Sequence, residues 1–214
     1  MTKRVYNFSA GPSTLPVSVL ENIASQMLNY HDSGMSVMEM SHRSSSYLEI
    51  FNETKAMLKK VMNIPDNYQI LFIQGGATQQ FSTIPLNLMK NGKADYIVTG
   101  SFSKKAAQEA QKFGDVHIAY DGSDQDFKHI PTQDELNIRE DASYVHLCSN
   151  NTIYGTEWKY VPDTHGIPIV ADMSSNILSK PINVSDYGMI YAGAQKNMGI
   201  AGLGVVIVRE DLIQ

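Results

Sequence analysis

The sequence feature that most constrains the fold is a series of short apolar runs that alternate with helical patterns along most of the chain. The clearest run, Gln69–Gln74 (QILFIQ), is followed by two glycines. Several runs are apolar at consecutive positions, as expected for strands that are covered on both faces. This alternation predicts an α/β fold, a three-layer α/β/α sandwich around a mostly parallel mixed sheet. Strands are predicted at 69–74, 96–99, 116–119, 144–148, 167–171, 189–192 and 205–208, and helices at 16–30, 45–62, 78–89 and 104–113.

The two ends of the chain differ from this regular pattern. Residues 1–15 contain Gly11-Pro12 and lead to Pro16, which predicts an extended arm before the first helix. Residues 16–214 are expected to form one large domain. Because the last residues, VVIVREDLIQ, end with a strand and the opening of a helix, we expect this domain to be incomplete at its carboxyl end.

Composition narrows the class of protein. Of the 214 residues 43% are apolar, which suffices for a buried core, and 17 basic residues against 22 acidic ones give a formal net charge of -5. This mild acidity predicts no nucleic-acid or membrane partner. The single cysteine, Cys148, suits a reducing cytoplasm, and the six histidines show no metal-ligand spacing, so no metal is expected.

The segment QILFIQGGATQQF is a candidate anion site. A buried strand, two glycines and then Ala77 and Thr78 before a helical run describe a turn whose backbone N–H groups can hold a phosphate. An ordinary tight turn capped by Thr78 explains the same residues equally well. The absence of a following Gly-Lys-Ser/Thr excludes a Walker loop.

Two further candidates follow buried strands near the end of the chain. Asp172 comes directly after Ile169–Ala171, at the carboxyl edge of a sheet, where it can pair with a cation or merely cap the next turn. Lys196 lies in a glycine-rich loop after 187–192 and is placed for nucleophilic chemistry, although most lysines are solvated surface residues.

Polar residues after two earlier segments complete the candidates. His42 and Arg43 lie in a polar turn before a helix, and an arginine there can bind a carboxylate or a phosphate. Thr152 follows the strand 144–148, where its hydroxyl can reach a ligand, although Asn150-Asn151 make a plain turn equally plausible. The order of these features, a phosphate turn and then a hydroxyl, an acid and a lysine at strand ends, favours a cofactor enzyme.

Six segments together resemble the phosphoserine aminotransferase family, within class V of the aminotransferases and the fold-type-I superfamily of pyridoxal-phosphate enzymes. They are NFSAGPSTLP, SVMEMSHRS, GGATQQFSTIPLNL, CSNNTIYGTEW, ADMSSNILSKPI and YAGAQKNMGIAGLGVVIVRED, and they recur in the family's order over essentially the whole chain. Family members are longer, so the resemblance implies that a carboxyl-terminal small domain is missing from this chain.

The resemblance also implies roles for individual residues. Lys196 carries the pyridoxal phosphate covalently, and Asp172 pairs with its ring nitrogen. Ala77 and Thr78 bind the cofactor phosphate. Phe102 stacks on the ring, Thr152 lies near the ring hydroxyl, and Gln195 makes another cofactor contact. Arg43 binds the substrate carboxylate, with His42 assisting at the substrate phosphate.

The implied reaction is transamination between L-glutamate and 3-phosphohydroxypyruvate, which gives O-phospho-L-serine and 2-oxoglutarate in serine biosynthesis. The resemblance also implies a cytoplasmic homodimer and, in bacterial members, a step of pyridoxine synthesis. Two alternatives stay open. The chain is a catalytically silent large-domain fragment that folds or dimerises with a partner, or it is a related aminotransferase with a different substrate. In either case we expect the isolated chain to bind the cofactor weakly.

Overall fold

The computed structural model describes residues 4–213. The chain divides into two compact units, residues 1–64 and 65–214, and each is treated by itself. The first three residues of the expected arm, and Gln214, lie outside the described residues. The expected division into an arm, 1–15, and a large domain, 16–214, stays a prediction.

The first unit contains two α-helices, α1 (Val17–Gln26) and α2 (Ser45–Met62). The Ser44 side chain caps α2 by accepting a hydrogen bond from the Tyr47 backbone N–H at 3.3 Å, and Asn63 ends the helix in the left-handed conformation. Both helices were predicted, but α1 is shorter than the expected range of 16–30. The Asn29 side chain accepts from the Gly34 backbone N–H at 2.7 Å, and such local bonds compete with helix continuation.

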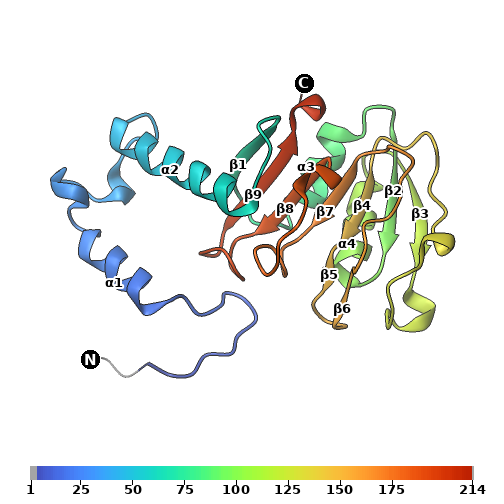
Figure 1. Cartoon of the computed structure of the whole chain (residues 1–214), viewed down its shortest axis with the longest axis horizontal. Helices are drawn as coiled ribbons and strands as arrows, with labels where there is room; N and C mark the ends of the chain where they lie inside the picture. The colour runs from blue at the N-terminus through green and yellow to red at the C-terminus, as the bar shows by residue number, and fades with distance from the viewer. Residues whose placement is uncertain (1–3, 214) are drawn as a thin grey trace. The chain divides into compact units, whose positions relative to one another are not determined.

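The second unit is built on a seven-stranded sheet with the order β1-β9-β8-β7-β4-β2-β3. Strand β9 runs antiparallel to both of its neighbours, and the other pairs are parallel. The α/β class with a mostly parallel mixed sheet is thus confirmed (Figure 1). The elements are β1 (Tyr68–Gln74), α3 (Gln80–Leu88), β2 (Lys93–Val98), α4 (Ser101–Ala110), β3 (Asp115–Asp121), β4 (Val145–Cys148), β7 (Ile169–Asp172), β8 (Met189–Gly193) and β9 (Leu203–Arg209).

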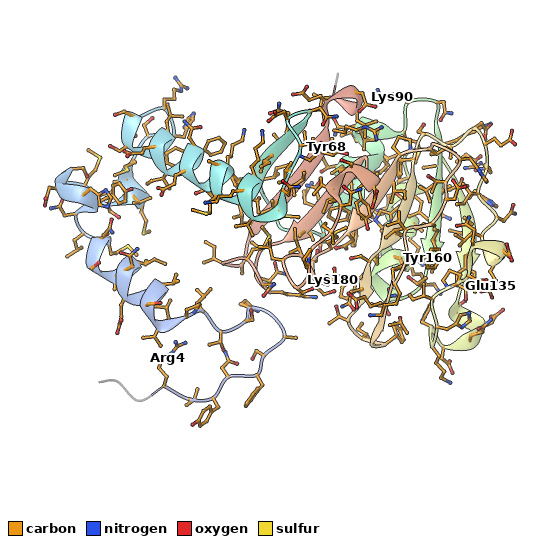
Figure 2. The ribbon with its side chains drawn as sticks, viewed as in Figure 1. Arg4, Tyr68, Lys90, Glu135, Tyr160 and Lys180 are labelled. Carbon is orange, nitrogen blue, oxygen red and sulfur yellow. The ribbon has the colours of Figure 1, made fainter. Side chains whose placement is uncertain are left out.

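The strands of the sheet match the apolar runs of the sequence because the central ones are covered on both faces. All residues of β4, β7 and β8 are buried. Tyr68, labelled in Figure 2, begins β1, and its hydroxyl donates to the Tyr187 backbone carbonyl at 2.6 Å, which holds this outer part of the sheet to the segment before β8. Two short strands, β5 (Asn150–Asn151) and β6 (Thr156–Glu157), form a separate hairpin that the sequence patterns did not predict.

The path of the chain changes direction within the sheet next to β2. From β2 it moves outward to β3, and then returns to add β4 on the other side of β2. In open α/β sheets such a switch leaves a crevice beyond the carboxyl ends of the two strands, where ligands bind. The topology therefore directs attention to the residues that follow β2 and β4, and to those that follow their neighbours β7 and β8.

Candidate functional site

Three of the residues singled out from the sequence meet at this switch point. The Lys196 ammonium, in the turn after β8, donates a hydrogen bond to the Thr152 hydroxyl at 3.2 Å. The same nitrogen lies 5.8 Å from the centre of the Phe102 ring, at the start of α4. Lys196 is half-buried rather than a fully solvated surface lysine. The amine therefore faces a hydroxyl and an aromatic ring from two other strand ends.

A buried asparagine holds the ends of β2 and β4 together. Asn151 accepts a hydrogen bond from the Thr99 hydroxyl at 3.1 Å, and its amide donates to the Thr156 hydroxyl at 3.1 Å. A Cβ on Gly100 would lie only 2.8 Å from the Asn151 side-chain oxygen, so glycine is needed where the two strand ends approach. This contact joins the two segments that lead to Phe102 and to Thr152.

Asp172 ends β7 and is buried. Its Oδ1 accepts from the Ser174 backbone N–H at 2.9 Å and from the Ser174 hydroxyl at 2.6 Å, so it does cap the next turn. Its Oδ2 has a weaker neighbour, the Cys148 thiol, with Sγ at 3.9 Å. Burial raises the pKa of the Asp172 carboxyl, while the bonds from Ser174 and the charge of Lys196 oppose that rise.

Ser174 is a site residue that the sequence analysis did not single out. Besides bonding Asp172, its hydroxyl accepts from the Gly193 backbone N–H at 3.1 Å, so it ties the end of β7 to the end of β8, three residues before Lys196. The available signal was the Asp-x-Ser spacing after a buried strand, which is typical of a side-chain turn.

The glycine turn between β1 and α3 is open and strained. Gly75 and Gly76 have φ values of 101° and 65°. A Cβ on Gly75 would lie 3.0 Å from the Gln79 Cβ, whereas Gly76 has open space around it. The helix cap is Gln79, without a side-chain hydrogen bond, so Thr78 is not the capping residue. The first backbone N–H groups of α3, on Gln80, Phe81 and Ser82, donate to carbonyls of residues 77–79, so an anion would be held by the N–H groups of the turn before the helix.

The remaining candidates are placed as follows. Gln195 is half-buried, and its side chain folds back so that a Cβ on Gly193 would lie 2.5 Å from its Oε1. His42 and Arg43 are exposed in the first unit, where the Arg43 Nε donates to the His42 Nε2 at 3.4 Å. These two residues belong to the first unit, and Lys196 belongs to the second.

The donors and acceptors of the second unit fit pyridoxal phosphate. The buried Asp172 carboxylate, with the Cys148 Sγ 3.9 Å from its Oδ2, offers an acceptor for a protonated ring nitrogen. Lys196 offers an amine, Phe102 a ring face, and the strained Gly75-Gly76 turn a place for a phosphate. These residues could hold the group, because they match its ring nitrogen, its aldehyde and its phosphate.

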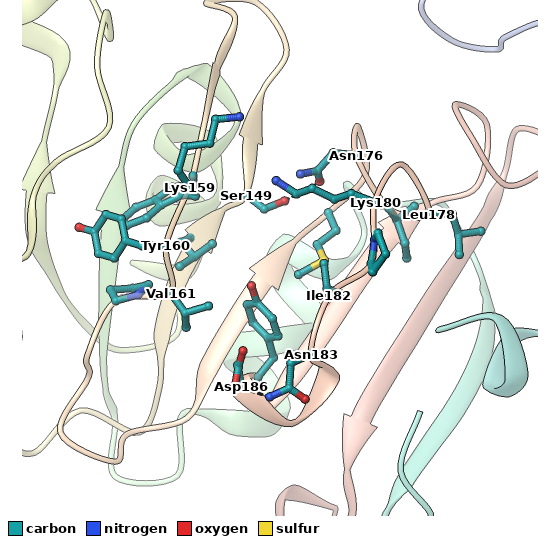
Figure 3. A pocket seen from close by; sticks show the side chains of 17 residues that line it. Ser149, Lys159, Tyr160, Val161, Asn176, Leu178, Lys180, Ile182, Asn183 and Asp186 are labelled. Atoms are coloured by element: carbon teal, nitrogen blue, oxygen red, sulfur yellow. Dashed lines mark hydrogen bonds between the residues drawn. The ribbon is translucent and has the colours of Figure 1, made fainter. Parts of the chain in front are cut away.

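A cavity of about 190 Å³ opens between the segments 158–162 and 176–187 (Figure 3). Its lining is largely apolar, and two lysines at the cavity, Lys159 and Lys180, pair with Glu157 at 2.6 Å and 2.8 Å. The hydrogen bonds from Lys159, Lys180 and Asn176 lower the pKa of Glu157 to about 2. Both lysines thus share one carboxylate partner, and Lys196 is not among the residues that line this cavity.

Residues 4–213 contain neither a candidate metal site nor a candidate membrane-spanning helix. No group of three or more His, Cys, Asp or Glu side chains in that range could hold a metal ion. No helix within it combines the length and the apolar character needed to cross a membrane.

Comparison with known proteins gives consistent results. Residues 5–214 match the aminotransferase class-V family. The phosphoserine aminotransferase of Lysinibacillus sphaericus is 52% identical over 100% of this chain and 59% of its own length. The solved structure of the Bacillus circulans phosphoserine aminotransferase superposes with a TM-score of 0.95 at 46% identity, over 99% of this chain and 59% of that one. The pyridoxal-phosphate-bound enzyme of Trichomonas vaginalis has a TM-score of 0.91 at 41% identity, over 98% and 59%. The chain thus spans 59% of the length of each of these relatives.

Proposed function

The chain belongs to the class-V aminotransferase family, and on this premise we propose that it is the cofactor-binding part of a phosphoserine aminotransferase. The proposed reaction is amino transfer between L-glutamate and 3-phosphohydroxypyruvate, giving O-phospho-L-serine and 2-oxoglutarate. The single observation that carries the proposal is the meeting of Lys196, Thr152 and Phe102 at the switch point, beside the buried Asp172.

Bound pyridoxal phosphate supplies an electron-withdrawing ring that stabilises the negative charge left when a substrate Cα loses its proton. In the proposal Lys196 has two tasks. Its Nζ holds the group covalently, and when released it accepts and returns the Cα proton as a general base. Half-burial supports this role because it limits competition by bulk water at that nitrogen.

The other residues orient the group in this proposal. Asp172 holds a proton on the ring nitrogen; burial raises the pKa of its carboxyl, and the hydrogen bonds from Ser174 favour the carboxylate that this role requires. Phe102 covers one ring face and Thr152 lies near the ring hydroxyl. The backbone of Ala77 and Thr78, at the end of the glycine turn, binds the phosphate, and Gln195 makes a further contact.

The substrates are proposed to be acidic small molecules. Arg43 would bind a carboxylate in the bidentate manner of a guanidinium, and His42 would assist at the phosphate. Their 3.4 Å contact, in which the Arg43 Nε–H donates to the His42 Nε2, supports a shared site because it places the two side chains together in the polar turn. We also propose a cytoplasmic homodimer, which the exposed apolar side chains of α1 support: none of its residues is buried.

The decisive experiment adds pyridoxal phosphate to the purified chain, reduces with borohydride and locates the adduct by mass spectrometry. We expect the adduct at Lys196 and its loss in Lys196→Ala. Lys180→Ala is the matched control, because that lysine is paired with Glu157 and belongs to the separate cavity. An adduct that persists in Lys196→Ala contradicts the assignment.

A second measurement separates the alternatives. The reverse reaction, amino transfer to 2-oxoglutarate, is measured with O-phosphoserine and with serine as competing amino donors. Preference for the phosphorylated compound supports the proposed substrate, and equal use of both favours a related aminotransferase. Because the chain spans 59% of its relatives' length, we expect slow turnover; an adduct without any turnover favours the catalytically silent fragment.

A further inference from the structure

A line of buried polar side chains runs across the sheet beneath Asp172. Strand pairing sets Cys148, Asp172 and Tyr191 in one row over β4, β7 and β8. His146 lies two residues before Cys148 and therefore on the same face of β4. Tyr191 and His146 are 0% and 1% exposed, and neither has a role in the reaction as proposed above.

The contacts within this line have a definite order. The His146 Nε2 and the Tyr191 hydroxyl are 2.9 Å apart. Tyr191 is the register partner of Asp172 across β7 and β8, and against the rise caused by burial a hydrogen bond from Tyr191 lowers the pKa of the Asp172 carboxyl. Other groups that face Asp172 are Ser174, Lys196 and the Cys148 thiol. Among these groups, Tyr191 supplies a hydroxyl from the neighbouring strand β8.

The protons of the pair can be assigned by counting donors and acceptors. Burial lowers the pKa of His146 to about 3, so the ring is neutral and one nitrogen carries a proton. The Nδ1 is buried without a partner among the described residues. A hydroxyl proton beside a carboxylate makes a stronger bond to that anion than to a neutral ring, so Tyr191 donates to Asp172. His146 must then donate to Tyr191, with its proton on Nε2.

We propose that Tyr191 and His146 are positioning residues for Asp172: the His146 Nε2–H donates to the Tyr191 hydroxyl, which is thereby directed to donate to the Asp172 carboxylate. The inference rests on the proposed function, in which that carboxylate must be an anion facing the ring nitrogen of the cofactor. Burial alone favours the neutral acid, which cannot hold a proton on that nitrogen. The hydrogen bond that the pair directs to Asp172 offsets this preference for the neutral acid.

The first test needs no cofactor. The carboxyl carbon of Asp172 is titrated by NMR in the uniformly labelled chain, with Asp172→Asn to assign the signal. We expect the pKa of this carboxyl to shift upward in Tyr191→Phe, which keeps the ring and removes the donor. We expect an upward shift in His146→Leu and none in His146→Gln, whose amide can donate from the position of Nε2.

The matched control is Tyr144→Phe. Tyr144 is 1% exposed, and its hydroxyl bonds Tyr96 at 2.7 Å, so the variant removes an equally buried hydroxyl without touching the His146–Tyr191 pair. Its Asp172 titration should match that of the unmodified chain. A pKa of Asp172 that is the same in all variants overturns the proposal, as does an equal shift in Tyr144→Phe. If Tyr191→Phe does not fold, the His146→Leu and His146→Gln pair makes the same comparison.

The second test uses pyridoxal phosphate labelled with ¹⁵N in its ring. The nitrogen shift of the bound group reports its protonation, and we expect a smaller protonated fraction in Tyr191→Phe and in His146→Leu than in His146→Gln. An unchanged fraction overturns the proposal. If the Asp172 titration responds as expected but no Lys196 adduct ever forms, the hydrogen-bond line is supported and the proposed function is contradicted.

Discussion

The Lys196 ammonium donates to the Thr152 hydroxyl across 3.2 Å, which joins two loops that are 44 residues apart in the chain. Neither residue belongs to a regular element. Each follows a buried strand, so the rigid sheet rather than the loops sets their separation. This pair offers a direct test of the site.

Thr152→Val removes the acceptor and keeps the shape of the side chain. We expect the dissociation constant of pyridoxal phosphate to rise about tenfold, because in the proposed complex the Thr152 hydroxyl bonds the ring oxygen of the cofactor, and a hydrogen bond to a charged group contributes ~1.5–3 kcal/mol. Thr152→Ser retains the hydroxyl and should bind like the unmodified chain. Absorbance titration measures both constants, and equal weakening in the two variants would show that the methyl group matters instead.

Gly75→Ala tests the glycine turn. The new Cβ would meet the Gln79 Cβ at 3.0 Å, on a backbone with φ of 101°. Gly166→Ala is the control, because Gly166 has φ of 84° and no atom within 4 Å of a built Cβ. In both variants the alanine at positive φ lowers the free energy of unfolding by ~1–2 kcal/mol. Gly75→Ala should lose about 1 kcal/mol more in urea unfolding, and only this variant should weaken cofactor binding.

Arg139 holds β2 and β3 through a partly buried ion network. Its Nε and backbone N–H donate to the two oxygens of Asp95 at 2.8 Å and 2.7 Å, and its Nη1 pairs with Asp115 at 2.6 Å. The Asp95 side chain is 0% exposed. Arg139→Leu leaves that carboxylate without its charged partner, so we expect a loss of about 3 kcal/mol in the free energy of unfolding.

The comparison for Arg139 is Lys93→Ala, which breaks an exposed pair with Asp141 in the same region. An exposed pair contributes about 0–1 kcal/mol, so this variant should unfold near the denaturant midpoint of the unmodified chain. Similar midpoints for Arg139→Leu and Lys93→Ala would mean that the buried network does not stabilise the sheet.

His146 makes the stability of the chain depend on pH in the acid range. Burial lowers its pKa from 6.5 to about 3. Between these values the unfolded chain binds a proton that the folded chain does not, so stability falls as pH drops below 6.5 and this contribution levels off near 3. The slope is at most about 1.4 kcal/mol per pH unit.

His146→Gln removes this titration while it keeps a donor next to Tyr191. The difference in unfolding free energy between the two chains should therefore be constant above pH 6.5 and change steadily below it, in favour of the variant. Urea unfolding at a series of pH values gives that difference. A flat difference over the whole range would mean that His146 is protonated in the folded chain.

The sequence by itself determined the local elements and the kinds of chemistry at their ends. Consecutive apolar residues predicted β4, β7 and β8, because only strands covered on both faces have that pattern. Three residues at or beyond their carboxyl ends, Thr152, Asp172 and Lys196, could be singled out because the carboxyl ends of parallel strands share one edge of a sheet. The early end of α1 could not be predicted in this way, because the local hydrogen bond of Asn29 beyond it has no periodic pattern in the sequence.

Only the tertiary structure decided which strand ends meet. The return of the chain to place β4 beside β2, the bond from Gly193 to Ser174 and the line from Tyr191 to His146 all depend on contacts between distant residues. Apolar periodicity reports whether a strand is covered, but every covered strand has the same pattern, so it cannot specify the neighbour. Strand order is set by the packing of the whole sheet, and with it the surroundings of Lys196.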